Sequence, residues 1–196
     1  MVDDGSKDGS RAALERFAQG HREVELVFHE ANWGKGAAIH TGVAHARGAY
    51  TIVQDADLEY DPGDYAKLLA AARERGARVV YGSRILGRQP FSYRSFYWGG
   101  RLVSLVASVL YWQRITDEPT CYKLFDTALL KSLPLREKGF GFCPEATALV
   151  CRRGERIVEV PIRYAPRSVK EGKKIRWTDG LEAIWILLKH RFKRRG

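Results

Sequence analysis

The sequence predicts an α/β fold with a mostly parallel sheet flanked by helices. Through the first half of the chain, segments with strand character alternate with helical segments, which is the pattern of layered α/β proteins. Glycines and an Asp-Pro pair separate these segments where helices end and begin. A chain of 196 residues without a long linker or a repeat fits one domain with its own core. We therefore expect residues 1–196 to form a single domain.

The first elements follow from short-range patterns. Val2 reads as the end of a strand. Asp8 and Ser10 flank a glycine and predict the start of a helix that ends at Gly20. Apolar and charged residues alternate over residues 24–29, which predicts a half-buried strand.

The following segments continue the alternation. Small residues at about 37–46 predict a helix, and residues 50–53 predict a central strand. Asp61 and Pro62 supply a cap and a first-turn proline for the next helix. Residues 79–81 predict the strand that follows it.

The second half contains two apolar segments that suit either a core or a membrane surface. Residues 96–112 are apolar and aromatic, but they are too short and too interrupted for a membrane span, which needs about 20 apolar residues. They predict a core helix or a helix at a lipid interface. Residues 178–195 predict an amphipathic helix with a basic end, which holds Lys189, Arg191, Lys193, Arg194 and Arg195.

Charge and cysteine content limit the partners and the compartment. The net charge of +10 predicts an acidic partner. A basic cluster behind an apolar helix favours a membrane surface, and the absence of a nucleic-acid-binding motif predicts that no nucleic acid binds. The three cysteines share no C-x-x-C spacing, so neither a disulfide framework nor a cysteine zinc site is indicated. The polar start predicts a cytoplasmic protein, peripheral to the cytoplasmic face of the membrane.

Asp55-Ala56-Asp57 is the most informative motif. It follows an apolar strand, at the edge where open parallel sheets bind their ligands. Two carboxylates in this spacing can share a hard divalent ion such as Mg²⁺ or Mn²⁺, and Glu59 could be a third ligand. Such an ion offsets the negative charge that gathers on a diphosphate leaving group. Taken alone, the pattern is also common on ordinary surface loops.

Further polar residues lie at strand ends or in a glycine turn. Asp3 and Asp4 could accept hydrogen bonds from a base or a ribose. Lys35 stands between two glycines that let the backbone approach a ligand. Arg84 suits a bidentate phosphate contact. Each could belong to an ordinary turn, but their positions at successive strand ends favour one binding edge.

In this order, the motifs resemble glycosyltransferase family 2. The branch with the most similar pattern is that of dolichol-phosphate mannose synthase-like, polyprenyl-phosphate glycosyltransferases. The resemblance implies the GT-A fold, a Rossmann-like fold for nucleotide-sugars, and it runs through nearly the whole chain. It rests on Val2-Asp3-Asp4-Gly5-Ser6, Asn32-x-Gly34-Lys35-Gly36, Asp55-Ala56-Asp57-Leu58-Glu59, Gly82-Ser83-Arg84, Thr116-Asp117-Glu118-Pro119-Thr120-Cys121-Tyr122-Lys123, Pro144-Glu145, Glu159-Val160-Pro161-Ile162 and Glu171-Gly172-Lys173-Lys174-Ile175.

The resemblance also implies a role for each site residue. Asp3 and Asp4 would lie beside the nucleoside. Asp55 and Asp57 would bracket the diphosphate and the metal ion, with Glu59 facing the metal. Basic residues would contact the donor and acceptor phosphates or close over the site in a late loop, and they are Lys35, Arg84, Arg94, Arg167 and Lys173.

The implied activity is that of an inverting hexosyltransferase. It would move a sugar from a GDP- or UDP-sugar to a polyprenyl phosphate, such as dolichyl or undecaprenyl phosphate, at a membrane surface. That acceptor is already an anion, so no strong general base is required. If the acceptor is instead a polysaccharide or protein hydroxyl, Asp117 or Glu118 would have to take its proton, although helix capping explains both residues equally well.

Two departures from the family pattern bear on activity. Family members begin with one more βα unit, about 30 to 40 residues that help to clamp the base. This chain starts after that point, so an N-terminally truncated, catalytically impaired remnant is a third alternative. Cys121 replaces a frequent glycine, and we expect it to be a small buried residue rather than a nucleophile.

Overall fold

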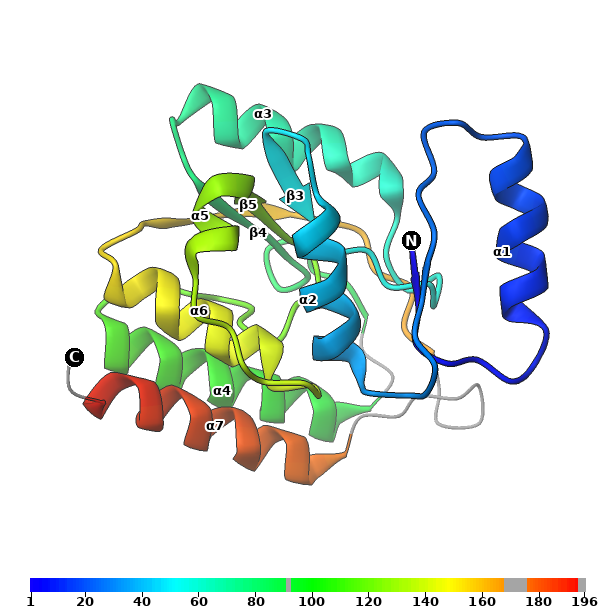
Figure 1. Ribbon diagram of the computed structural model, residues 1–196. Helices are drawn as coiled ribbons and strands as arrows, with labels where there is room; N and C mark the ends of the chain where they lie inside the picture. The colour runs from blue at the N-terminus through cyan, green and yellow to red at the C-terminus, as the bar shows by residue number, and fades with distance from the viewer. Residues whose placement is uncertain (91–92, 168–175, 194–196) are drawn as a thin grey trace.

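The computed structural model describes residues 1–90, 93–167 and 176–193, and these form a layered α/β arrangement (Figure 1). A 3₁₀ turn, η1 (Pro62–Asp64), precedes the third helix. The α-helices are α1 (Ser10–Gln19), α2 (Lys35–His45), α3 (Tyr65–Glu74), α4 (Arg94–Tyr111), α5 (Thr127–Ser132), α6 (Phe142–Arg152) and α7 (Trp177–Phe192).

The strands form two sheets. In the smaller one, β1 (Val2–Asp3) pairs in parallel with β2 (Val27–Phe28). The larger sheet has the order β3-β5-β4-β6 and consists of β3 (Tyr50–Ile52), β4 (Val79–Ser83), β5 (Lys123–Asp126) and β6 (Ile157–Pro161).

Strand direction in the larger sheet determines where the polar residues meet. Strand β5 runs antiparallel to both β3 and β4, while β4 and β6 are parallel, so β3, β4 and β6 all point the same way. The start of β5 therefore lies at the edge where the other three strands end, with Lys123 beside Tyr81 and Leu124 beside Ile52. The expected α/β fold with strands mostly in one direction is confirmed.

Side-chain alternation along the strands divides the core between the two faces of the sheet. Val79 and Tyr81 of β4 belong to a cluster with residues of α4, α5, α6 and α7. Val80 points to the opposite face and packs with Leu68 and Ala72 of α3. All five residues of β4 are buried, as expected for a strand covered by helices on both sides.

Most predicted elements are present, but one strand is shorter than expected. The pattern over 24–29 is a strand only at Val27–Phe28. Its parallel partner β1 is the two-residue strand Val2–Asp3, whose register pairs it with Val27 and Phe28. The helix expected at 37–46 spans Lys35–His45, and Asp61 caps η1 by accepting a hydrogen bond from the Gly63 amide at 2.7 Å.

Helices α4 and α7 pack together along the lower side of the molecule in Figure 1. Helix α4 buries Val103 and Ala107 but leaves Trp98 and Val109 exposed, so the segment expected to be either a core helix or an interfacial helix has both kinds of face. Helix α7 lies where a helix is expected over 178–195, but it ends at Phe192 with Lys193 as its C-cap, and Arg194 and Arg195 lie outside the described residues. Within the described residues, no helix is both long and apolar enough to cross a bilayer.

Candidate active site

The first of the two central aspartates is paired with a lysine. Asp55 follows β3, and Lys35 is the first residue of α2, after a glycine whose φ of 100° lets the chain turn sharply into the helix. The Lys35 Nζ donates to Asp55 Oδ2 at 2.5 Å and to Cys121 Sγ at 3.0 Å. Burial disfavours the ammonium charge, but Cys121 and Asp55 outweigh it and raise the pKa of Lys35. The glycine turn and the Asp-x-Asp loop are thus joined.

The second aspartate contacts the segment after β6. Arg167 NH2 donates to Asp57 Oδ2 at 3.0 Å, and the Arg167 amide donates to Glu59 Oε1 at 2.9 Å. Glu59 is buried and also accepts a hydrogen bond from the Tyr164 hydroxyl at 2.8 Å. Between the two carboxylates, Leu58 is 89 % exposed with a φ of 59°, a conformation that is strained for a leucine. This left-handed residue reverses the chain between Asp57 and Glu59.

The three proposed metal ligands fit a divalent ion in kind but are not gathered around one point. Carboxylate oxygens suit Mg²⁺ and Mn²⁺. Within the described ranges, however, the one trio of acidic or histidine groups whose ligand atoms lie within 4.8 Å of each other is found elsewhere. Lys35 and Arg167 instead compensate the charges of Asp55 and Asp57. An ion bound between the two aspartates would therefore have to replace at least one of these cations.

Asp4 holds the glycine turn in place. Its Oδ1 accepts hydrogen bonds from His29 Nδ1 at 2.7 Å and from the Trp33 amide at 3.0 Å, while its Oδ2 accepts from the Gly34 amide at 2.8 Å. Burial raises the pKa of Asp4, but these hydrogen bonds prevail and keep it below its usual value. The neighbouring Asp3 is 5 % exposed and accepts from the Ser6 amide. Asp4 thus positions the turn that delivers Lys35 to Asp55.

Arg84, which is expected near the phosphates, binds Asp117, which is a candidate base for a hydroxyl acceptor. Arg84 donates from Nε and NH2 to the two Asp117 oxygens at 2.8 and 2.7 Å, and its amide adds a third bond at 2.8 Å. Glu159 of β6 fixes the backbone on the other side by accepting from the Thr116 and Asp117 amides. Burial opposes the charge of Arg84, yet the Asp117 carboxylate raises the pKa of the guanidinium above its usual value. Asp117 therefore orients a cation that stays charged.

Beside this pair lies a buried lysine whose role the sequence analysis missed. Lys123 is fully buried at the start of β5, where its Nζ donates to the Glu118 carbonyl at 2.5 Å and lies 3.9 Å from the centre of the Tyr81 ring. The Glu118 carboxylate accepts from Thr147 Oγ1 at 2.9 Å. Burial raises the pKa of Glu118, and Lys123 opposes that rise. A lysine inside the apolar run Tyr122-Lys123-Leu124-Phe125 was the signal available in the sequence.

Cys121, expected to be a small buried residue, is partly buried and has a thiol neighbour. A hydrogen bond couples Cys121 to Cys143 of α6. That bond and the nearby Lys123 and Lys35 ammonium groups outweigh burial and lower the pKa of Cys143 to about 7. The Cys151 thiol, by contrast, is buried without a comparable cation, and its pKa rises to about 12.

The structure thus brings together residues from five strand ends and loops. The carboxylates of the Asp-x-Asp loop, the cation at the start of α2, the Arg84–Asp117 pair and Arg167 all lie along the edge where β3, β4 and β6 end. Arg94, the first residue of α4, is exposed. Lys173 lies outside the described residues.

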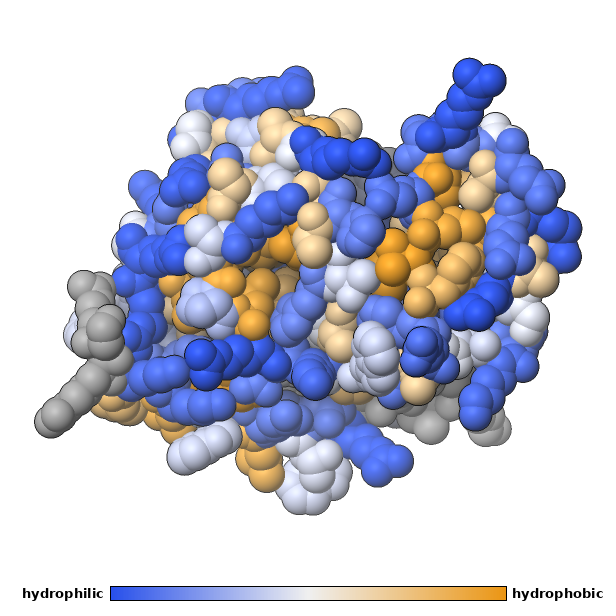
Figure 2. All heavy atoms as spheres, in the orientation of Figure 1, coloured by the Kyte–Doolittle hydropathy of each residue, from blue (hydrophilic) through white to orange (hydrophobic). Residues whose placement is uncertain are grey.

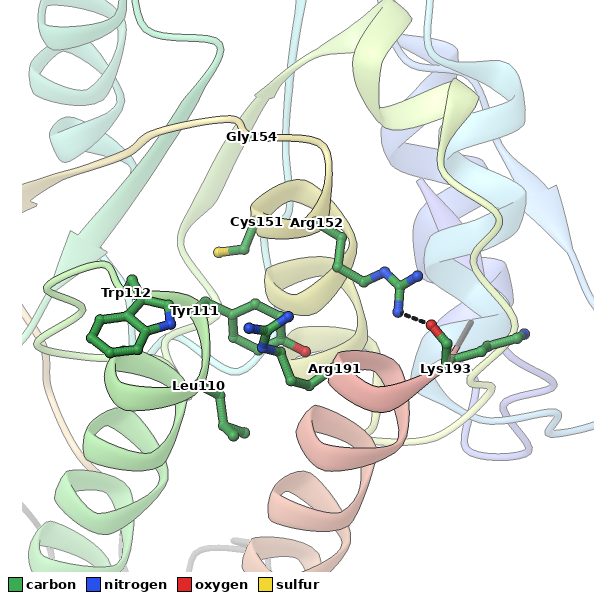
Figure 3. A pocket seen from close by; sticks show the side chains of 8 residues that line it. All are labelled: Leu110, Tyr111, Trp112, Cys151, Arg152, Gly154, Arg191 and Lys193. Carbon is green, nitrogen blue, oxygen red and sulfur yellow. Dashed lines mark hydrogen bonds between the residues drawn. The ribbon is translucent and has the colours of Figure 1, made fainter. Parts of the chain in front are cut away.

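Two surface pockets lie away from this edge, and neither is lined by a predicted site residue. Each measures about 380 Å³. One lies between β1, β2 and the end of α2, where it contacts Val2 and Val27. The other lies where α4, α6 and α7 end, and Figure 3 shows Trp112, Tyr111 and Arg191 around it.

Comparison with known sequences identifies the family. Residues 1–133 match the model of glycosyl transferase family 2. An undecaprenyl-phosphate mannosyltransferase from Micrococcus luteus is 30 % identical over 88 % of this chain and 74 % of its own length. A dolichyl-phosphate beta-glucosyltransferase from Trichomonas vaginalis is 28 % identical over 96 % of this chain, which spans only 59 % of that relative.

Solved structures support the fold. Glucosyl-3-phosphoglycerate synthase from Mycobacterium tuberculosis superposes with a TM-score of 0.68 at 20 % identity, covering all of this chain and 69 % of that one. A mannosyltransferase from Pyrobaculum calidifontis, solved in complex with GDP-Man and Mn²⁺, has a TM-score of 0.61 at 20 % identity and covers 97 % of this chain and 52 % of its own. The family match over residues 1–133 and the relative from Micrococcus luteus show that this chain belongs to glycosyl transferase family 2, and that it is a hexosyltransferase with the GT-A fold.

Proposed function

We propose that this chain transfers a sugar, with inversion, from a nucleotide-sugar to a polyprenyl phosphate. The observation that carries the proposal is the alternation of carboxylates and cations at one sheet edge, where Lys35 pairs with Asp55 and Arg167 pairs with Asp57. Carboxylates there suit a divalent ion, and cations suit a diphosphate. The names of the relatives from Micrococcus luteus and Trichomonas vaginalis support a lipid phosphate as acceptor.

Each residue of this edge has a chemical task in the proposed reaction. Asp55 and Asp57 would hold Mg²⁺ or Mn²⁺, with Glu59 close by, and the ion would offset charge on the departing nucleoside diphosphate. Lys35 and Arg167, released from the aspartates, would contact diphosphate oxygens. Asp3, which ends β1, would lie beside the nucleoside, with Asp4 fixing the adjacent turn. The donor would be a GDP- or UDP-sugar.

The contacts of the two candidate bases favour a phosphate acceptor over a hydroxyl acceptor. Both Asp117 oxygens accept hydrogen bonds from Arg84, and Glu118 is fully buried beside Lys123. Neither carboxylate is placed to take a proton from a hydroxyl. A lipid phosphate needs no base, because its attacking oxygen is already an anion. Arg84 and the exposed Arg94 would supply positive charge for that phosphate.

The proposal is tested by measuring the release of nucleoside diphosphate by the purified chain. The reaction should contain Mn²⁺, a GDP- or UDP-sugar and either undecaprenyl phosphate or a soluble sugar acceptor with a free hydroxyl. We expect release with the lipid phosphate and none above background with the hydroxyl. Release with the hydroxyl alone would show the alternative activity. Calorimetric titration that detects no binding of GDP or UDP, with or without Mn²⁺, would indicate the impaired remnant.

We also propose that α4 and α7 present this edge to a membrane. Five large apolar residues on one face of α4 and just beyond it are exposed, and α7 exposes four more. They are Trp98, Leu102, Leu105, Val109 and Trp112, and Trp177, Leu181, Trp185 and Phe192. Figure 2 shows apolar side chains at the surface along the lower rim, where the two helices lie in Figure 1.

Basic residues beside this apolar face support a lipid surface as its partner. Lys189, His190 and Arg191 are in the last turn of α7, and Arg191 and Lys193 line the pocket next to Trp112 (Figure 3). Indole rings at the surface with lysine and arginine near them are the pattern of a protein that contacts anionic headgroups.

Replacing Trp177 and Trp185 together with alanine is expected to lower binding to phosphatidylserine-containing vesicles by about tenfold or more, because burying even part of each indole contributes on the order of 1 kcal/mol. Cosedimentation measures the change. Phe17→Ala on α1 is the matched control, since it removes an exposed aromatic ring from another part of the molecule. Equal vesicle binding by the double variant and the parent chain would contradict the assignment of this face.

A further inference from the structure

A second cluster of metal-binding groups lies outside the active site. Glu137 precedes α6, Glu145 is in the first turn of α6, and His190 is in the last turn of α7. One ligand atom from each lies within 4.8 Å of the other two. The cluster therefore joins the first turn of α6 and the loop before it to the end of α7, which is distant in the sequence.

Hydrogen bonds fix the central carboxylate and direct one oxygen towards the histidine. Glu145 is 1 % exposed, and its Oε2 accepts from the Arg136 and Glu137 amides at 2.9 and 2.8 Å. Its Oε1 faces His190 Nε2 at 3.7 Å. That separation is too long for a hydrogen bond. It is close to the distance of about 3.3 Å between two ligands of one tetrahedral zinc ion with bonds of 2.0 to 2.1 Å.

Among the described residues, the imidazole of His190 faces the Glu145 carboxylate without a hydrogen bond. His190 is 8 % exposed, and its imidazole makes no hydrogen bond with any residue that the structure describes. The ring is instead directed at the Glu145 carboxylate, where a shared ion would join the two groups. Lys189 lies 3.3 Å from Glu137 Oε1 and is half exposed, so it can move aside.

We propose that Glu137, Glu145 and His190 bind a zinc ion, with water as the fourth ligand. One imidazole and two carboxylates suit Zn²⁺ in kind and number. The ion would fasten α7, which carries the exposed tryptophans, to α6 and to the loop before it. The loop carbonyls of Lys138 and Gly139 accept hydrogen bonds from the first amides of α2, beside Lys35. Zinc would thereby connect the proposed membrane face with the turn that holds Lys35.

Zinc binding can be measured without any transfer assay. A chain carrying Asp55→Asn and Asp57→Asn, which weaken the active-site cation position, is stripped with a chelator and dialysed against ZnCl₂. We expect about one zinc per chain by elemental analysis. Co²⁺ in its place should give the strong visible absorption of a four-coordinate ion. The Glu137 side chain is partly exposed, so Glu137→Gln should leave the fold intact. It should weaken zinc binding at least about tenfold, and His190→Ala should abolish zinc binding.

Matched variants separate this site from others. His21→Ala, which removes an exposed histidine beside Glu23, should leave zinc binding unchanged. Circular dichroism and thermal unfolding check that the variants fold. If His190→Ala does not fold, Glu137→Gln provides the decisive comparison. The proposal would be overturned if the parent chain bound no zinc, or if neither Glu137→Gln nor His190→Ala changed zinc binding. It would also be overturned if Cys121→Ser and Cys143→Ser removed the zinc instead.

Discussion

Replacing Asp57 with asparagine is expected to lower the rate of sugar transfer by about a thousandfold. A divalent ion contributes several kcal/mol to stabilising a departing diphosphate, and each 1.4 kcal/mol corresponds to about a factor of ten in rate. Asparagine keeps the size of the side chain but removes the charge that would hold the ion. The measurement is the initial rate of nucleoside diphosphate release at saturating Mn²⁺.

A matched control distinguishes loss of chemistry from loss of structure. Asp61→Asn is four residues away and keeps its helix-capping oxygen, so its rate should stay within about twofold of the parent. Asp57 is partly exposed and its ion pair with Arg167 is screened, so Asp57→Asn should change the free energy of unfolding by less than about 1 kcal/mol. A fully active Asp57→Asn enzyme would refute the assignment of this aspartate to the metal.

Replacing Lys123 with methionine is expected to lower the free energy of unfolding by about 3 to 5 kcal/mol. The Lys123 Nζ donates to the Glu118 carbonyl, and its charge also acts on the Glu118 carboxylate, so the change leaves a buried carbonyl without its donor and a buried carboxylate without its nearby cation. Leaving a buried charge uncompensated typically costs about 3 to 5 kcal/mol. Here the group left behind is Glu118, which is fully buried and retains the Thr147 hydroxyl as a hydrogen-bond donor. Urea unfolding followed by circular dichroism measures the change. Lys131→Met, at an exposed position on α5, should cost no more than about 0.5 kcal/mol.

The same variant should respond to pH in a defined direction. The folded-state pKa of Glu118 is already above its unfolded value because of burial, and losing Lys123 raises it further. The folded variant then binds a proton that the unfolded chain releases, so the deficit is greatest above the raised pKa and shrinks as pH falls towards 4.5. Adding Glu118→Gln should restore part of the lost stability at neutral pH and remove this pH dependence. A Lys123→Met deficit that is equal at every pH would contradict the electrostatic influence of Lys123 on the Glu118 carboxylate.

The elements of this fold could largely be predicted from local patterns in the sequence. The Asp61-Pro62 pair starts a helical segment, as expected, because its cap and its fixed proline φ act within a few residues. The strand at Tyr50–Ile52 and the central strand from Val79 follow from short apolar runs. The strand predicted over 24–29 is shorter in the structure, because the extent of a strand depends on pairing with a partner that is distant in the sequence and not on local alternation alone.

The sequence by itself determined the family, the elements and the chemical kinds of residue at the strand ends, since motif order and side-chain periodicity are written in neighbouring positions. Only the tertiary structure decided which charges meet. Lys35 and Asp55 are 20 residues apart, and Arg167 and Asp57 are 110 apart. The reversed direction of β5 places buried Lys123 beside Tyr81, and the packing of α7 on α6 brings His190 to Glu145. Such pairings depend on strand direction and helix packing, which fix distances between side chains that no local pattern relates.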